Sequence, residues 1–246
     1  MREHLRTSPA VPRPIELPFS PAEAASGLCH CPGFLFLDSA GNLPANYPQP
    51  LSILAAFPEA TLRGSLHEPD DRARLQAAVD SRTIERPDCG FPLGGAFGTI
   101  DYDGRYHFGL YPNLLVHAHR SGQWFEVGTL AGHLRPPRPA PSPVPCSWTG
   151  NFSRDEFLAA VRTAQEYIAA GDIYQVNLSQ RFRTRLPAGS ADRSFFPLYE
   201  RLRQFSPAPM AAYLHTGARE ILSSSPETFL RLHGTSIETR PIKGCL

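Results

Sequence analysis

The chain has 246 residues, and its 24 basic residues against 23 acidic ones leave a formal net charge of +1. This balance excludes a general polyanion binder, because phosphate contacts need a clustered excess of lysine and arginine. No apolar run approaches the roughly 20 residues of a membrane helix, and Met1–Leu5 does not open a secretory signal. We therefore expect a cytoplasmic protein with no nucleic-acid partner and no membrane partner.

The N-terminal half begins with a proline-rich segment, residues 1–33, which has weak patterning and which we treat as separate. The region 34–134 then predicts an α+β arrangement of short apolar runs bounded by turn residues. One helix is expected over 70–81, and Asp103-Gly104 predicts a hairpin turn. The expected strands are 34–37, 52–57, 97–102, 106–110 and 114–117.

A proline-rich connection separates the two halves of the chain. Residues 135–146 hold six prolines, which cannot donate to a sheet and favour an extended connection. We place the connection at 135–147, and a second region at 148–246.

The second region is more sharply patterned. Ser153 and Glu156 form a capping box that starts a helix ending at Gly171, and polar and apolar residues then alternate as a strand over 173–182. A second helix is expected over 194–205. The remaining expected strands are 211–215, 220–223, 228–232 and 236–240. The fold class is therefore α+β, with antiparallel sheets flanked by helices.

The cysteines and the single lysine are residues whose side chains could bind a metal or act as a nucleophile. Cys29 and Cys31 flank His30, but zinc ligands usually come in two clusters and no second cluster follows, so we expect reduced thiols. Lys243 is the only lysine among the 24 basic residues. An arginine effectively never loses its proton, whereas a lysine can become a neutral nucleophile, although a lone lysine is usually a solvated surface charge.

Three segments carry a recognisable pattern: Gly171–Phe182 (GDIYQVNLSQRF), Ser225–Phe229 (SPETF) and Thr239–Gly244 (TRPIKG). In this order and spacing they resemble the chorismate-utilising enzymes, which include anthranilate synthase component I and aminodeoxychorismate synthase component I. Gly94–Gly98 and Ser206–Met210 are supporting matches. The resemblance implies the N-terminal part of the anthranilate synthase component I fold, truncated, with 148–246 as an incomplete chorismate-binding catalytic region.

One position separates the members of this family. Anthranilate synthases typically have Pro-Ile-Ala-Gly, whereas Pro-Ile-Lys-Gly is typical of aminodeoxychorismate synthases. The resemblance therefore implies that Lys243 adds to C2 of chorismate, that Glu227 is the general acid for the departing C4 hydroxyl, and that the backbone of Gly244 contacts substrate. Ammonia then adds at C4 and gives 4-amino-4-deoxychorismate, the precursor of p-aminobenzoate and folate.

These roles require shifted pKa values. The amine needs a lowered pKa, to which the nearby Arg240 or a bound cation would contribute, and the glutamate needs a raised one. Each residue also has a plainer interpretation. Glu227 and Gly244 are then turn residues, and Gln175, Asn177 and Arg181 are one solvated strand face.

The resemblance also implies a cofactor and a partner. The cofactor is Mg²⁺, whose ligands are expected downstream of Leu246, so no metal ligand is assigned within the chain. The partner is a glutamine amidotransferase that supplies ammonia, since no cysteine here lies in a glutaminase-like motif. We accordingly expect an N-terminal fragment that is catalytically silent and poorly stable by itself.

Some family members hold tryptophan in a pocket between an early serine-containing strand and a Pro-x-Pro segment. The matching residues here are Ser39, Pro207, Pro209 and Met210, and ordinary packing is the alternative to a ligand pocket.

Two other functions stay open. One is anthranilate synthase component I, against which Lys243 argues. The other is a non-catalytic remnant that docks an amidotransferase or binds an aromatic amino acid.

Overall fold

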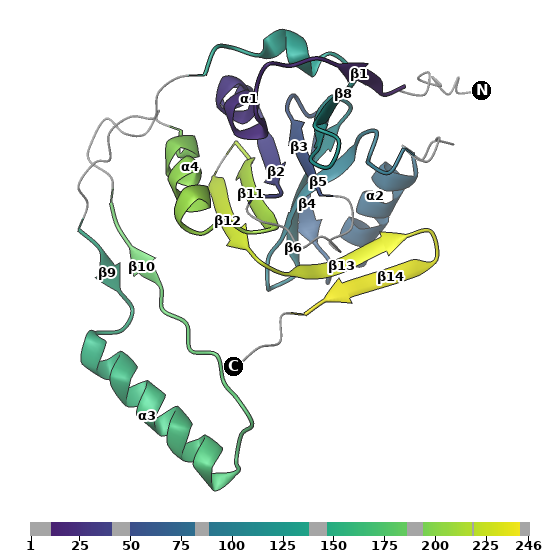
Figure 1. Cartoon of the computed structure of the whole chain (residues 1–246). Coiled ribbons are helices and arrows are strands. Elements are labelled where there is room, and N and C mark those ends of the chain that lie inside the picture. The colour runs from purple at the N-terminus through teal and green to yellow at the C-terminus, as the bar shows by residue number, and fades with distance from the viewer. Residues whose placement is uncertain are drawn as a thin grey trace. The chain divides into compact units, whose positions relative to one another are not determined.

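The computed structural model describes residues 11–40, 50–81, 89–137, 147–185, 194–217 and 219–241. The chain divides into two compact units, one made of Met1–Ala140 with Ser194–Leu246 and the other of Pro141–Arg193. Helices mix with antiparallel strands, which confirms the expected α+β class (Figure 1). None of the described helices combines the length and the apolar character that crossing a bilayer requires.

The first unit contains a seven-stranded antiparallel sheet of order β1-β8-β7-β3-β2-β11-β12. One of its pairings joins β2 to β11, strands from opposite halves of the chain, with Ala211 opposite Asp38. The strands are β1 (Arg13–Ile15), β2 (Leu35–Asp38), β3 (Leu51–Ala55), β7 (Leu114–Ala118), β8 (Gln123–Val127), β11 (Met210–His215) and β12 (Glu220–Ser225). A short 3-10 helix, Leu130–His133, follows β8.

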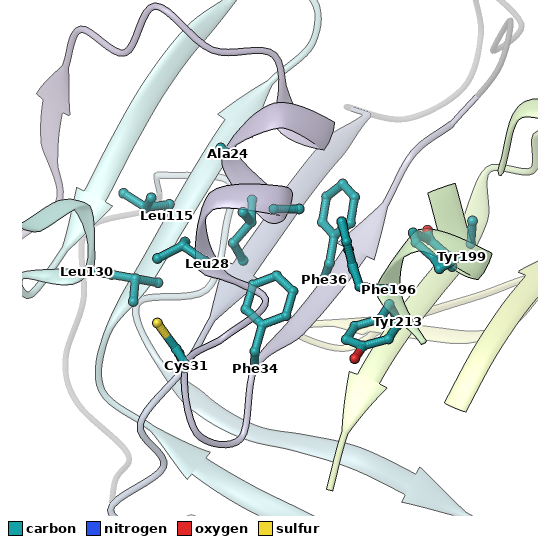
Figure 2. Close-up of a cluster of buried hydrophobic side chains, with 14 of the residues drawn as sticks. Ala24, Leu28, Cys31, Phe34, Phe36, Leu115, Leu130, Phe196, Tyr199 and Tyr213 are labelled. Atoms are coloured by element: carbon teal, nitrogen blue, oxygen red, sulfur yellow. The ribbon is translucent and has the colours of Figure 1, made fainter. Parts of the chain in front are cut away.

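Helix α1 (Pro21–Leu28) lies in the proline-rich segment 1–33, whose weak patterning predicted no helix. Ser20 and Glu23 form its capping box. Ala24, Ala25 and Leu28 are fully buried in the main core, beside Leu115 and Leu130 (Figure 2). The small alanines give a weak sequence signal, but they allow the helix to approach the sheet closely.

Helix α4 (Phe196–Phe205) confirms the helix expected over 194–205. Its Phe196 and Tyr199 pack by their edges against Phe34 and Phe36 of the sheet, each with ring centroids 6.0 Å apart, and Tyr213 completes the aromatic cluster (Figure 2). The quadrupoles of the rings favour such edge-to-face contacts, which hold the helix on the sheet.

A separate three-stranded sheet has the order β4-β6-β5, with β4 (Ala60–Ser65), β5 (Gly95–Ile100) and β6 (Arg105–Tyr111). The hairpin predicted at Asp103-Gly104 is confirmed, and Gly104 takes a φ of 74°, which a side chain would disfavour. Helix α2 (Pro69–Asp80) confirms the helix expected over 70–81. Gly94, with a φ of 131°, directly precedes β5, which begins at Gly95.

Strands β13 (Thr228–His233) and β14 (Ser236–Arg240) form a two-stranded antiparallel hairpin, as predicted. Phe229, Leu230, Leu232 and Ile237 are all exposed on it.

The second unit contains β9 (Thr149–Gly150), α3 (Arg154–Ala170) and β10 (Phe182–Arg183). The capping box of Ser153 and the left-handed Gly171 at the other end of α3 are confirmed. The strand expected over 173–182 is wrong, because only Phe182 belongs to a ladder. Alternating polarity makes a strand only where a neighbouring strand supplies hydrogen bonds; within the described residues none pairs with 173–181, and Tyr174 is 92% exposed.

Candidate functional site

The β13–β14 hairpin brings two of the three sequence motifs together. Thr228 lies opposite Arg240, and the Thr239 hydroxyl donates to the Thr228 carbonyl over 3.5 Å. Glu227 directly precedes Thr228, and Pro241 directly follows Arg240. The Ser-Pro-Glu segment and the start of the Pro-Ile-Lys-Gly segment are therefore neighbours at one end of the hairpin.

Glu227 is exposed at this hairpin end. Its backbone N–H donates to the Ser225 hydroxyl over 3.5 Å, a long contact that belongs to the turn between β12 and β13. Within the described residues its carboxylate makes no hydrogen bond, so it is free to meet a ligand. The turn contact fits the alternative that Glu227 is only a turn residue. The general-acid role stays a prediction.

Lys243 and Gly244 lie outside the described residues. Arg240, which the sequence suggested as a charge acting on Lys243, makes an ion pair with Glu238 of the same strand. Its charge is therefore partly offset locally by a carboxylate.

The residues expected to form the tryptophan pocket come together through the β2–β11 pairing. Ser39 follows Asp38, and Met210 precedes Ala211, the partner of Asp38. The Ser39 hydroxyl donates to the Leu51 carbonyl at 2.8 Å, so it already has a partner in the protein. Pro207 is exposed and Pro209 is half-buried. This arrangement suits either packing or a ligand, and the pocket stays a prediction.

A buried polar cluster beside Ser39 was missed by sequence reasoning. The Asp38 side chain, fully buried, accepts from Arg203 Nε at 2.7 Å, from the Tyr199 hydroxyl at 3.3 Å and from the Ser52 hydroxyl at 3.3 Å. Ser52 Oγ lies 2.8 Å from His119 Nε2. The only local signal was an acidic residue directly after the apolar run 34–37.

The environment sets the charges of this cluster. Burial lowers the pKa of His119, with Arg203 acting in the same direction and Asp38 opposing it. Burial, with Asp38 beside it, raises the pKa of Tyr199. Neutral His119 and the protonated phenol thus surround the Asp38–Arg203 ion pair. Because Ser52 is fully buried, its contact with His119 offers no nucleophile to a substrate, and the cluster serves to join β2, β3, β7 and α4.

The third motif lies in the second unit, where its end is tied to the start of α3. The Arg181 N–H donates to Asn151 Oδ1 at 2.7 Å, and Gln180 Nε2 donates to the Phe152 carbonyl at 3.0 Å. Gln175 and Asn177 are exposed. They do not form a strand face, because the strand itself is absent from this segment.

No group of three or more histidine, cysteine, aspartate or glutamate side chains gathers to hold a metal ion in the described ranges. Cys29 and Cys31 are free thiols, and burial raises the pKa of Cys29 to about 11. A thiol must ionise to bind metal, so this environment opposes a metal role for Cys29.

The comparisons with known proteins agree with the motifs. The family of chorismate binding enzymes matches residues 35–246, and the chain therefore belongs to that family. Anthranilate synthase component 1 of Aquifex aeolicus is 45% identical over 98 residues, which are 40% of this chain and 19% of that protein. Aminodeoxychorismate synthase component 1 of Salmonella typhimurium is 39% identical over 112 residues, which are 46% of this chain and 24% of that protein. The matched stretches thus span a quarter or less of these two relatives.

Proposed function

We propose that this chain contributes to an aminodeoxychorismate synthase component I, a cytoplasmic enzyme that aminates chorismate at C4 for p-aminobenzoate and folate synthesis. The observation that carries the proposal is Lys243 within Pro-Ile-Lys-Gly, at the position where the anthranilate-forming members typically have alanine. The relatives named aminodeoxychorismate synthase support it.

Lys243 acts as a covalent nucleophile in this proposal. Its neutral amine forms a bond to C2, the two conjugated ring double bonds shift, and the C4 hydroxyl leaves as water with a proton from Glu227. Ammonia then forms a bond to C4, both double bonds shift back, and the lysine amine leaves from C2. The position of Glu227, beside the strand that leads to Lys243, supports its role as the proton donor.

The family resemblance also implies Mg²⁺. The described residues offer no cluster of ligands for it, so the proposal assigns no residue to the metal and routes no step through it. Ammonia would come from a glutamine amidotransferase partner.

The test uses the longest polypeptide that the reading frame encodes, supplied with chorismate and ammonia. We expect Lys243→Ala and Lys243→Arg to abolish 4-amino-4-deoxychorismate, because neither side chain is a neutral amine near pH 7. Mass spectrometry should detect a chorismate adduct on the wild-type lysine alone. Arg72→Ala, an exposed change on α2, is the control that keeps activity. Amination by Lys243→Ala at the wild-type rate would refute the nucleophile.

Anthranilate synthase component I is the second candidate, and the 45% identity to the Aquifex aeolicus protein favours it. Product analysis separates the two, because this reaction yields anthranilate and pyruvate. A polypeptide that forms neither product, yet binds an amidotransferase or an aromatic amino acid, would instead support the non-catalytic remnant.

A further inference from the structure

A cavity of about 350 Å³ lies between the three-stranded sheet and the loops that flank β2 and β11. Gly33, before β2, and His215, at the end of β11, line it. Ser39, Met210 and Glu227 lie at the opposite ends of these strands and of β12. The cavity is therefore separate from the candidate sites described above.

The cavity has room because a glycine occupies the middle of the sheet face. In the register, Gly109 of β6 lies opposite Thr61 of β4 and Phe97 of β5. A Cβ atom at Gly109 would lie 2.5 Å from the Tyr111 ring, so a larger residue would not fit. The apolar walls come from Pro32, Phe57, Pro58, Phe97 and Leu214. Aromatic and apolar walls of this kind suit a flat ring.

Phe57 is held in a costly backbone conformation at the wall of this cavity. Its φ is 57°, and it is the one non-glycine residue with positive φ in the part of the chain that the structure describes. Its N–H donates to the Pro32 carbonyl at 2.9 Å, and its ring packs on His133. Strained residues of this kind gather at ligand sites.

One side of the cavity is basic. His107 lines it, and Arg63 Nε, opposite in the β4–β6 register, lies 3.4 Å from His107 Nε2. An adjoining hollow, which shares Thr61, is lined by Arg63 and Arg74. Arg74 is paired with Asp71 at 2.8 Å, whereas Arg63 has no carboxylate partner within the described ranges.

Two further observations concern the charge and the hydrogen bonding on this side, where Arg219 is paired with Asp101. Burial lowers the pKa of His107, and the positive charges of Arg63 and Arg219 lower it further. Neutral His107 then accepts the hydrogen bond from Arg63. On the same sheet face, directly opposite His107, the Thr99 hydroxyl is buried and finds no hydrogen-bond partner among the residues that the structure describes. The guanidinium of Arg63, beside His107 at the cavity wall, is a group that a carboxylate would complement.

The geometry points to a binding site for a small aromatic monocarboxylate in this cavity, with its ring against Phe57 and Phe97 and its carboxylate toward Arg63 and His107. A planar guanidinium suits a carboxylate because it donates two parallel hydrogen bonds. A single arginine without a carboxylate partner among the described residues favours a ligand with one negative charge. The site does not depend on the proposed amination chemistry.

The experiment measures binding of benzoate and of benzamide, its uncharged analogue, to the full chain by calorimetry and by NMR. We expect benzoate to bind at least about tenfold more tightly than benzamide. Arg63→Gln should remove this preference, while Arg154→Gln, an exposed arginine of the second unit, should keep it. Thr61→Trp places a bulky ring at an exposed edge-strand position and should block both probes.

Equal affinities for the two probes in the wild-type chain would overturn the proposal. So would an unchanged preference in Arg63→Gln, or benzoate-induced shifts confined to Ser39 and Met210. Circular dichroism checks that each variant is folded, and if Thr61→Trp does not fold, Arg63→Gln decides alone. The Lys243 variants leave this site untouched, so its failure and the failure of the proposed function are distinguishable.

Discussion

The centre of the seven-stranded sheet and the β13–β14 hairpin are both built from short antiparallel strands with apolar residues, yet their environments are opposite. Phe34, Phe36 and Tyr213 are fully buried between the sheet and helices α1 and α4 (Figure 2). On the hairpin, Phe229 is 83% exposed, and Leu232 and Ile237 are also exposed. The hairpin nevertheless carries parts of two of the three family motifs.

The difference shows that the residues that stabilise the fold are not the residues of the family motifs. The sheet centre removes aromatic and aliphatic surface from water, which is the main favourable contribution to folding. The described part of the hairpin buries little, so its side chains contribute little to the free energy of unfolding. Its residues are instead available to meet other groups, as a site on a turn between strands requires.

Among these predictions, Phe36→Ala should cause the largest loss in the free energy of unfolding. Truncation of a fully buried ring that packs on Tyr199 leaves a cavity and is expected to lower the free energy of unfolding by about 4 kcal/mol. Phe229→Ala on the hairpin is the matched control, with a change within about 0.5 kcal/mol. Urea unfolding followed by tryptophan fluorescence measures both, and similar losses would show that the hairpin is packed in solution.

Asp38→Asn tests the polar part of the sheet centre. Removal of the carboxylate charge leaves the Arg203 guanidinium, which lies 2.7 Å away, without its counter-charge, and we expect a loss of about 3 kcal/mol. Asp101→Asn breaks the exposed pair with Arg219 and should cost less than about 1 kcal/mol. Equal costs in urea unfolding would mean that burial does not distinguish the two pairs.

The histidines of the sheet centre predict a pH dependence. Burial lowers the pKa of His117 and His119, so the folded state keeps them neutral at pH values where the unfolded chain, with a pKa of 6.5, takes up protons. Stability is therefore present above pH 6.5 and is lost as the pH falls, by at most about 1.4 kcal/mol per histidine and pH unit.

His119→Gln should reduce this slope, since glutamine does not titrate. Unfolding free energies measured from about pH 7.5 to about pH 5.5 give the slope. A variant with the wild-type slope would show that His119 does not contribute to it.

The smallest expected effects come from the two capping boxes. Ser20→Ala at the buried helix α1 and Ser153→Ala at the exposed helix α3 each remove one hydrogen bond to a backbone N–H, at a cost of about 1 kcal/mol. Because α1 is part of the core, its loss should appear in global unfolding. The loss at α3 should appear as faster hydrogen exchange within Arg154–Ala170 alone, and faster exchange throughout the chain would contradict this.

The sequence by itself determined the features that depend on neighbouring residues. The capping box at Ser153, the hairpin at Asp103-Gly104 and the hairpin around Gly234 are all present, since each depends on residues only a few positions apart. The motifs likewise determined the family, because residue identity and spacing suffice for that. The chemistry assigned to Lys243 and Glu227 stays a prediction.

Only the tertiary structure decided the features that depend on distant partners. Helix α1 is in the core because the sheet offers a face that its alanines fit, and Asp38 is buried because Tyr199 and Arg203 reach it from the other half of the chain. Residues 173–181 are not a strand because no described strand pairs with them, although their alternation favours one. A local pattern fixes what a segment can form, whereas burial and hydrogen-bond partners, which come from elsewhere in the chain, fix what it does form.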